Sequence, residues 1–114
     1  MIEQIKIEDI PILDLELLKT RENIGVTFLP KLIRAFNMEV PKLMEIIQLS
    51  YQNSDYNNVK ELGHKLKGMC LNMGALRLSE IGRRIEDEEG DLYLILGQIE
   101  TIFNETMYQL DQTM

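Results

Sequence analysis

The sequence predicts an all-α fold: an antiparallel four-helix bundle preceded by a short extra N-terminal helix. Apolar residues recur at steps of three and four through four long stretches, which is the spacing of one helix face. The connections between these stretches are short, so successive helices must be antiparallel neighbours. The chain has 114 residues, enough for one domain with a single core. We therefore expect residues 1–114 to form a single helical domain.

The N-terminal region is expected to add little to the bundle itself. Residues 1–13 are a lead-in whose alternating apolar and charged groups suggest a short extended piece, although Pro11 opposes regular structure. Residues 14–22 are predicted to form the short extra helix, with Asp14 as its N-cap. We expect this helix to cover one end of the bundle.

Residues 24–52 are predicted to form one long helix, through apolar positions that include Phe36, Val40 and Leu43. Two prolines interrupt the pattern. Pro30 is tolerated if it lies in the first turn, whereas Pro41 removes a backbone hydrogen bond and is expected to kink or break the helix.

The second half of the chain contains the other three predicted bundle helices. Residues 55–73 follow two candidate caps, Ser54 and Asp55, and Gly74 closes that helix as a residue in the left-handed conformation. Residues 75–88 and 92–110 form the last two helices, separated by an acidic turn. The small residues Gly63 and Gly82 are expected to let neighbouring helices approach closely.

Composition excludes several classes of function. The net charge is −7, which disfavours nucleic acid and anionic membrane as partners. A single cysteine, Cys70, excludes an internal disulfide, and no stretch resembles a signal peptide or a membrane-spanning helix. No glycine-rich phosphate-binding loop, zinc site or calcium loop is present. We expect a cytoplasmic protein that binds no cofactor and does not use ATP.

The only histidine, His64, lies on the polar face of the predicted helix 55–73. Lys67 and Gly68 follow on the same face, three and four residues on. A glycine inside an exposed helix costs roughly 1 kcal/mol relative to alanine, so its value here is clearance above the ring. An exposed imidazole is mostly neutral at pH 7 and can act as a nucleophile without first losing a proton. From Lys60 to Arg84 the local charge is +4, which suits an acidic partner.

An ordered set of residues around His64 carries a family resemblance. It comprises His64-Lys-Leu-Lys67-Gly68, Asn72-Met-Gly74-Ala75, Leu78 and Arg83-Arg-Ile-Glu86. This set resembles a histidine-containing phosphotransfer (HPt) domain, and the length and the N-terminal apolar pattern agree. Met69 departs from the small residue that usually follows the glycine in this family, which affects local packing.

The resemblance implies roles for four residues. His64 would be the phosphoacceptor, Lys67 would help to hold the phosphoryl oxygens, and Gly68 would leave room for the partner. Glu86 matches a position from which a Gln or Glu hydrogen-bonds the ring Nδ1, leaving Nε2 as the nucleophile. Helical rise also puts Glu86 within about a turn of the level of His64, at 1.5 Å per residue, but an ordinary exposed glutamate is an equally good interpretation.

The partners implied by the resemblance are response-regulator receiver domains and a hybrid sensor histidine kinase. The chain would accept a phosphoryl group from a receiver phosphoaspartate and pass it to another receiver, with Mg²⁺ supplied by the receiver. The expected docking residues surround His64 and are Lys60, Lys65, Leu71, Arg83 and Arg84. We expect a monomer.

Two alternatives remain open from the sequence. One is an adaptor of the same fold that binds or sequesters a receiver domain without passing phosphate. The other is a structural helical bundle that exposes a histidine by chance, which would bind no receiver at all.

Overall fold

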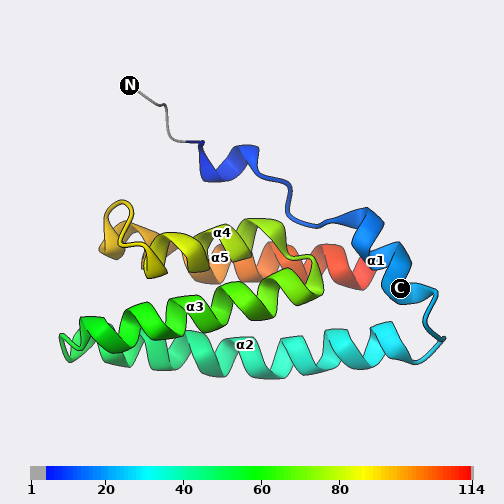
Figure 1. Cartoon of the computed structure of the whole chain (residues 1–114), viewed down its shortest axis with the longest axis horizontal. Helices are drawn as coiled ribbons and strands as arrows, with labels where there is room; N and C mark the ends of the chain where they lie inside the picture. Colours follow the sequence, from blue (N-terminus) through cyan, green and yellow to red (C-terminus); the bar gives the residue numbers. More distant parts are fainter. Residues whose placement is uncertain (1–4, 114) are drawn as a thin grey trace.

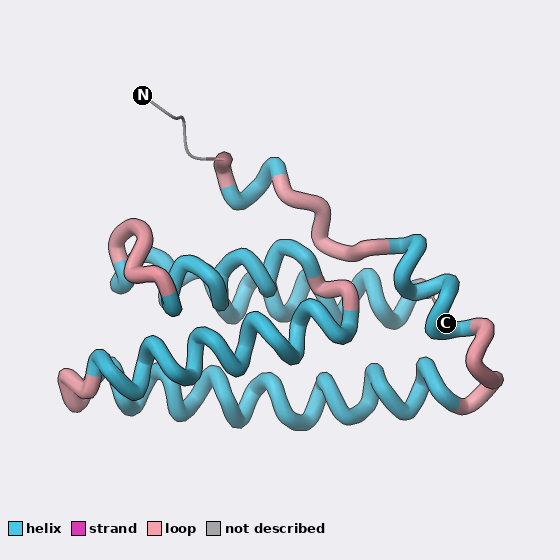
Figure 2. Tube along the Cα trace, in the orientation of Figure 1, coloured by secondary structure: helices cyan, strands magenta, loops and turns pink. Residues whose placement is uncertain are grey.

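The computed structural model describes residues 5–113, and the regular structure within that range is entirely helical (Figure 2). The elements in chain order are the 3-10 helix η1 (Ile7–Asp9) and the α-helices α1 (Leu15–Glu22), α2 (Phe28–Gln52), α3 (Tyr56–Met73), α4 (Leu76–Glu86) and α5 (Leu92–Gln112). Helices α2 to α5 lie side by side as a bundle, and α1 packs against the start of α2 at one end (Figure 1). The predicted fold class is confirmed.

One apolar core fills the space between the four long helices. On α2, Phe36, Val40, Leu43 and Ile47 are each 5% exposed or less, as their helical spacing predicted. Leu66 of α3 is fully buried, as are the core residues of α4. The exposed faces of α3 and α4 beside this core are therefore held on a rigid base.

Asp14, Asp55 and Gly74 cap helices as predicted, whereas Ser54 takes a φ of 58° in the turn before α3 and is not its N-cap. The helix predicted over 75–88 runs only from Leu76 to Glu86, because the chain turns at Asp87 and Glu88. The side chain of Asp14 accepts a hydrogen bond from the amide of Leu17 at the start of α1, and Asp55 does the same for Asn58 at the start of α3. Gly74 closes α3 with a φ of 76°, a conformation that suits glycine.

Helix α2 differs from its prediction in two ways. It begins at Phe28 rather than at residue 24, because Ile24 and Val26 are 58% and 94% exposed and belong to the preceding loop. The helix also continues through Pro41 without a break. The buried neighbours Val40 and Leu43 keep this turn packed on the core, which outweighs the loss of one backbone hydrogen bond.

The N-terminal segment forms a 3-10 turn where an extended piece was expected, and residues 1–4 of the predicted lead-in lie outside the described residues. The guanidinium of Arg77 on α4 donates to the carbonyl of Ile10 at 2.8 Å and to that of Glu8 at 3.0 Å. Further along, the amide of Asp14 donates to the carbonyl of Gly74 at 2.8 Å. The segment thus runs along α4 to the α3–α4 turn (Figure 1).

Two glycines bring α3 and α4 into close contact. A Cβ atom at Gly63 would lie 2.6 Å from Cγ2 of Ile85, and one at Gly82 would lie 2.7 Å from the backbone nitrogen of Lys67. The close approach predicted for both glycines is therefore present. It places the last turn of α4 directly against the middle of α3, where the histidine is found.

Candidate functional site

His64 projects from the middle of α3 with 69% of its side chain exposed to solvent. Gly68, one turn further along, is also exposed, and a Cβ atom built there would meet nothing within 4 Å. The ring is thus open to an approaching molecule from the side that Gly68 leaves clear. Packing within the chain does not explain this glycine.

Glu86, the last residue of α4, contacts the ring of His64. Its Oε1 atom lies 2.7 Å from Nδ1. An ionised carboxylate can only accept a hydrogen bond, so Nδ1 must carry the proton and donate it. In the neutral ring the free lone pair then lies on Nε2, the nitrogen opposite Nδ1. The expected level of Glu86 beside His64 agrees with this contact.

Lys67 holds the other oxygen of the same carboxylate. Its ammonium nitrogen lies 2.7 Å from Oε2 of Glu86, an atom that is shielded from solvent. The contact with Lys67, followed by the hydrogen bond from His64, lowers the pKa of Glu86 below the ordinary value of 4.5. Glu86 is therefore ionised at neutral pH, as its role as an acceptor from Nδ1 requires. Spacing along the sequence did not indicate this second partner.

The remaining predicted docking residues on α3 differ in their contacts. Lys60 lies 3.9 Å from a carboxylate oxygen of Glu88, a long and exposed ion pair. Lys65 is exposed, and among residues 5–113 it forms no ion pair. Leu71 is 50% exposed, two turns from His64. Lysine charge and apolar surface are thus both accessible on the histidine side of α3.

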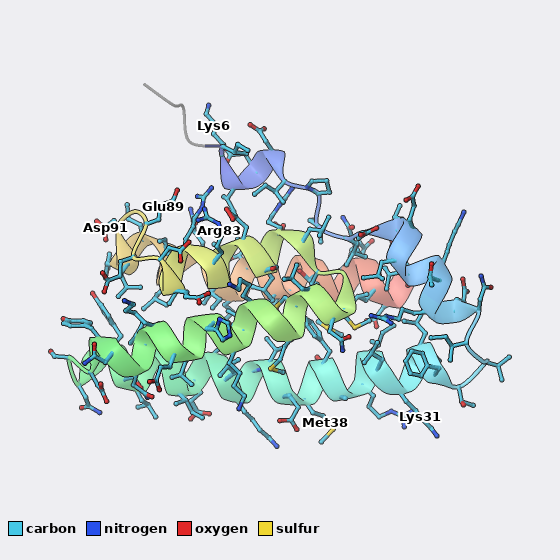
Figure 3. The ribbon with its side chains drawn as sticks, viewed as in Figure 1. Lys6, Lys31, Met38, Arg83, Glu89 and Asp91 are labelled. Atoms are coloured by element: carbon cyan, nitrogen blue, oxygen red, sulfur yellow. The ribbon has the colours of Figure 1, made fainter. Side chains whose placement is uncertain are left out.

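Arg83 and Arg84 are engaged within the chain. Arg83 forms ion pairs with Glu80, Asp87 and Glu89, and its side chain and that of Glu89 lie beside the end of α4 (Figure 3). Arg84 is 12% exposed and pairs with Glu80. The positive charge of these arginines is therefore partly compensated by Glu80 one turn earlier and by Asp87 and Glu89 after the helix.

The chemistry available to this arrangement is nucleophilic. The exposed Nε2 lone pair belongs to a ring whose other nitrogen is fixed by Glu86, and a lysine lies one turn away. These are the features of a group-transfer site in which the second reactant comes from another molecule. The family model described as the Hpt domain matches residues 31–113 of this chain.

The chain belongs to the Hpt domain family. Membership assigns it a role in phosphotransfer within two-component signalling. The Hpt fold is also found in the crystal structure of histidine-containing phosphotransfer protein B (HptB) from Pseudomonas aeruginosa PAO1, with a TM-score of 0.84 and 21% sequence identity over 90% of this chain and 94% of that chain. Curated protein sequences give no significant match. Within residues 5–113, none of the helices combines the length and the hydrophobicity that spanning a bilayer requires.

Proposed function

We propose that this Hpt domain is a phosphorelay intermediate that accepts a phosphoryl group on Nε2 of His64 from a receiver phosphoaspartate and passes it to the aspartate of another receiver. The observation that carries the proposal is the 2.7 Å contact between Nδ1 and Glu86 on a ring that is 69% exposed. That contact directs the lone pair to the nitrogen that a docked partner can reach.

In the forward step the Nε2 lone pair attacks phosphorus, and the bond between phosphorus and the aspartyl oxygen breaks. The aspartate leaves as a carboxylate, and the imidazole ring, which retains its Nδ1 proton, becomes positively charged. The carboxylate of Glu86 then faces a cation, so its hydrogen bond with Nδ1 becomes charge-assisted on both sides. Glu86 thereby favours the product of attack more than the neutral ring.

Lys67 changes its partner during this step in our proposal. Before transfer its ammonium group neutralises Glu86. Once the ring carries a positive charge, Glu86 has a second cationic partner, and Lys67 can turn toward the phosphoryl oxygens one turn along the same helix face. The reverse reaction onto a second receiver returns Lys67 to Glu86. Most of the remaining charge stabilisation would come from the receiver, including its Mg²⁺.

Docking is proposed to use the α3 surface around His64. Lys60, Lys65 and Lys67 offer positive charge to the acidic phosphorylation site of a receiver, and the half-exposed Leu71 offers an apolar contact. Gly68 leaves clearance between these groups. Arg83 and Arg84 are held by ion pairs within the chain, so they contribute less to this proposed surface than the lysines of α3.

The test is transfer of labelled phosphate from a phosphorylated receiver domain to the wild type and to His64→Gln. We expect label on the wild type alone, in a linkage that is labile in acid and stable in alkali. If receivers bind both proteins and neither takes label, the chain is a non-transferring adaptor and the proposal is wrong. If no receiver binds either protein, the phosphorelay proposal is wrong in a different way, because its docking step is missing.

A further inference from the structure

Helix α4 ends at Glu86, the residue that contacts the ring of His64. The turn that follows places a residue other than glycine in the left-handed conformation. The amide of Glu89 donates to the carbonyl of Arg84 at 2.9 Å, and that of Glu88 donates to Ile85 at 3.4 Å. This pair of bonds is the Schellman arrangement, in which the residue after the cap takes the left-handed conformation. Here that residue is Glu88, with a φ of 55°.

A left-handed conformation is unfavourable for a residue that has a side chain, and glycine is the usual occupant of this position. The carbonyl groups of Arg84 and Ile85 accept their hydrogen bonds from Glu89 and Glu88, so the left-handed residue also holds in place the last turn of α4. Glu86 lies in that turn. The contact between Glu86 and His64 thus depends on a helix end that the backbone alone holds poorly.

Arg83 spans this helix end from the side. Its Nη1 atom lies 3.0 Å from Oδ2 of Asp87 and 2.6 Å from Oε2 of Glu89, the residues immediately before and after Glu88. The rest of its guanidinium group binds both oxygens of Glu80, one turn earlier and only 17% exposed. One planar group therefore joins the body of α4 to both sides of the left-handed residue.

We propose that Arg83 is a positioning residue for the His64–Glu86 pair: by clamping Asp87 and Glu89 to Glu80, it holds the last turn of α4 in the geometry that lets Glu86 bind Nδ1. The inference rests on the proposed function of His64. It gives Arg83 a role within the chain, distinct from contact with a receiver, and it predicts an effect on the ring before any receiver is present.

The experiment compares Arg83→Gln with the double variant Arg83→Gln/Glu88→Gly. The first removes the clamp, and the second adds the glycine that the turn prefers without restoring the arginine charge. Arg77→Gln is the matched control, since it removes the same charge from the same helix and its ion pair is with Glu105 on α5. Two readouts are needed: the ¹⁵N chemical shifts of the His64 ring in the isolated protein, which report the tautomer, and the rate of phosphoryl transfer from a receiver.

We expect Arg83→Gln to reduce the share of rings protonated on Nδ1 and to slow transfer by roughly threefold to tenfold, the scale expected when a reacting group is loosely held. The double variant should recover both, and Arg77→Gln should change neither. An unchanged tautomer in Arg83→Gln would overturn the proposal. So would slow transfer that Glu88→Gly does not recover, because this result assigns Arg83 to docking.

The two proposals fail in different ways. If the wild type accepts no phosphoryl group, the proposed relay function is wrong, and the ring tautomer in the isolated variants still decides whether Arg83 positions Glu86. If the wild type accepts the phosphoryl group and Arg83→Gln leaves the ring tautomer of His64 unchanged, only the positioning role is wrong.

Discussion

Gly68 and Gly97 form a matched pair that separates helix stability from access to the histidine. Both lie inside long helices, Gly68 in α3 and Gly97 in α5, and a Cβ atom at either position would meet nothing within 4 Å. Replacing either by alanine should therefore gain the full difference in helix propensity, about 1 kcal/mol. For a chain of this size that corresponds to a rise in Tm of about 4 °C.

The two positions should differ when the new side chain is large. Gly68→Leu puts a branched side chain one turn from His64, on the face proposed for receiver docking, and we expect transfer to slow at least about tenfold. Gly97→Leu places the same group on α5, which carries none of the residues proposed for the site, and should leave transfer unchanged. Thermal unfolding followed by circular dichroism and transfer of labelled phosphate are the two assays.

The combination of results is what tests the reasoning. A protein with Gly68→Leu that is at least as stable as the wild type and transfers slowly supports the role of Gly68 in clearance. Transfer at the wild-type rate would refute it. A fall in stability for Gly68→Ala, with the expected rise for Gly97→Ala, would show that Gly68 has a structural role instead.

Further predictions concern the contacts around this site. Gly82→Ala should lower the free energy of unfolding by about 1–3 kcal/mol, measured by urea titration, because its Cβ atom would meet the backbone of Lys67. Glu88→Gly should raise it by about 1 kcal/mol by relieving the left-handed conformation, as urea titration would also show. The pKa of Glu86 is lowered, so its pair with Lys67 stabilises the fold above the unfolded-chain pKa, and this contribution is lost as the pH falls through the folded one. An NMR titration of the Glu86 carboxyl carbon should therefore have its midpoint below 4.5.

The parts of the fold that depend on local chemistry were predictable from the sequence. Asp14 and Asp55 are good N-caps in any context, and Gly74 is the residue that a left-handed helix end favours. The expectation that glycine marks a left-handed residue failed at Ser54 and Glu88, which take this conformation without being glycine. Ser54, with a φ of 58°, was expected as a cap, and Glu88 was assigned to the helix that in fact ends before it. Backbone hydrogen bonds close both turns, from the amide of Asp55 to the carbonyl of Ser50 and from that of Glu89 to the carbonyl of Arg84, and composition does not indicate them.

For the candidate site, the sequence predicted which residues lie at the same height on neighbouring helices, but it did not predict which side chains form ion pairs. Helical rise brought Glu86 to the height of His64, because a short turn fixes the register of two antiparallel helices. Which charges bind one another depends on side-chain conformations, which spacing does not determine. For that reason the pairing of Lys67 with Glu86 and the triple pairing of Arg83 were missed. Pro41 shows the same limit: proline usually breaks a helix, but core packing of its neighbours keeps α2 continuous there.

The exposure of His64 has a consequence for how long a phosphoryl group would stay on the chain. A bond between nitrogen and phosphorus at a ring that is 69% open to water has no surrounding wall to protect it from hydrolysis. Its lifetime would be set by its own chemistry and by how soon a receiver covers it. If the chain is such a carrier, its phosphorylated fraction would follow the current ratio of phosphorylated to free receivers, and the fold around His64 adds nothing that prolongs the signal.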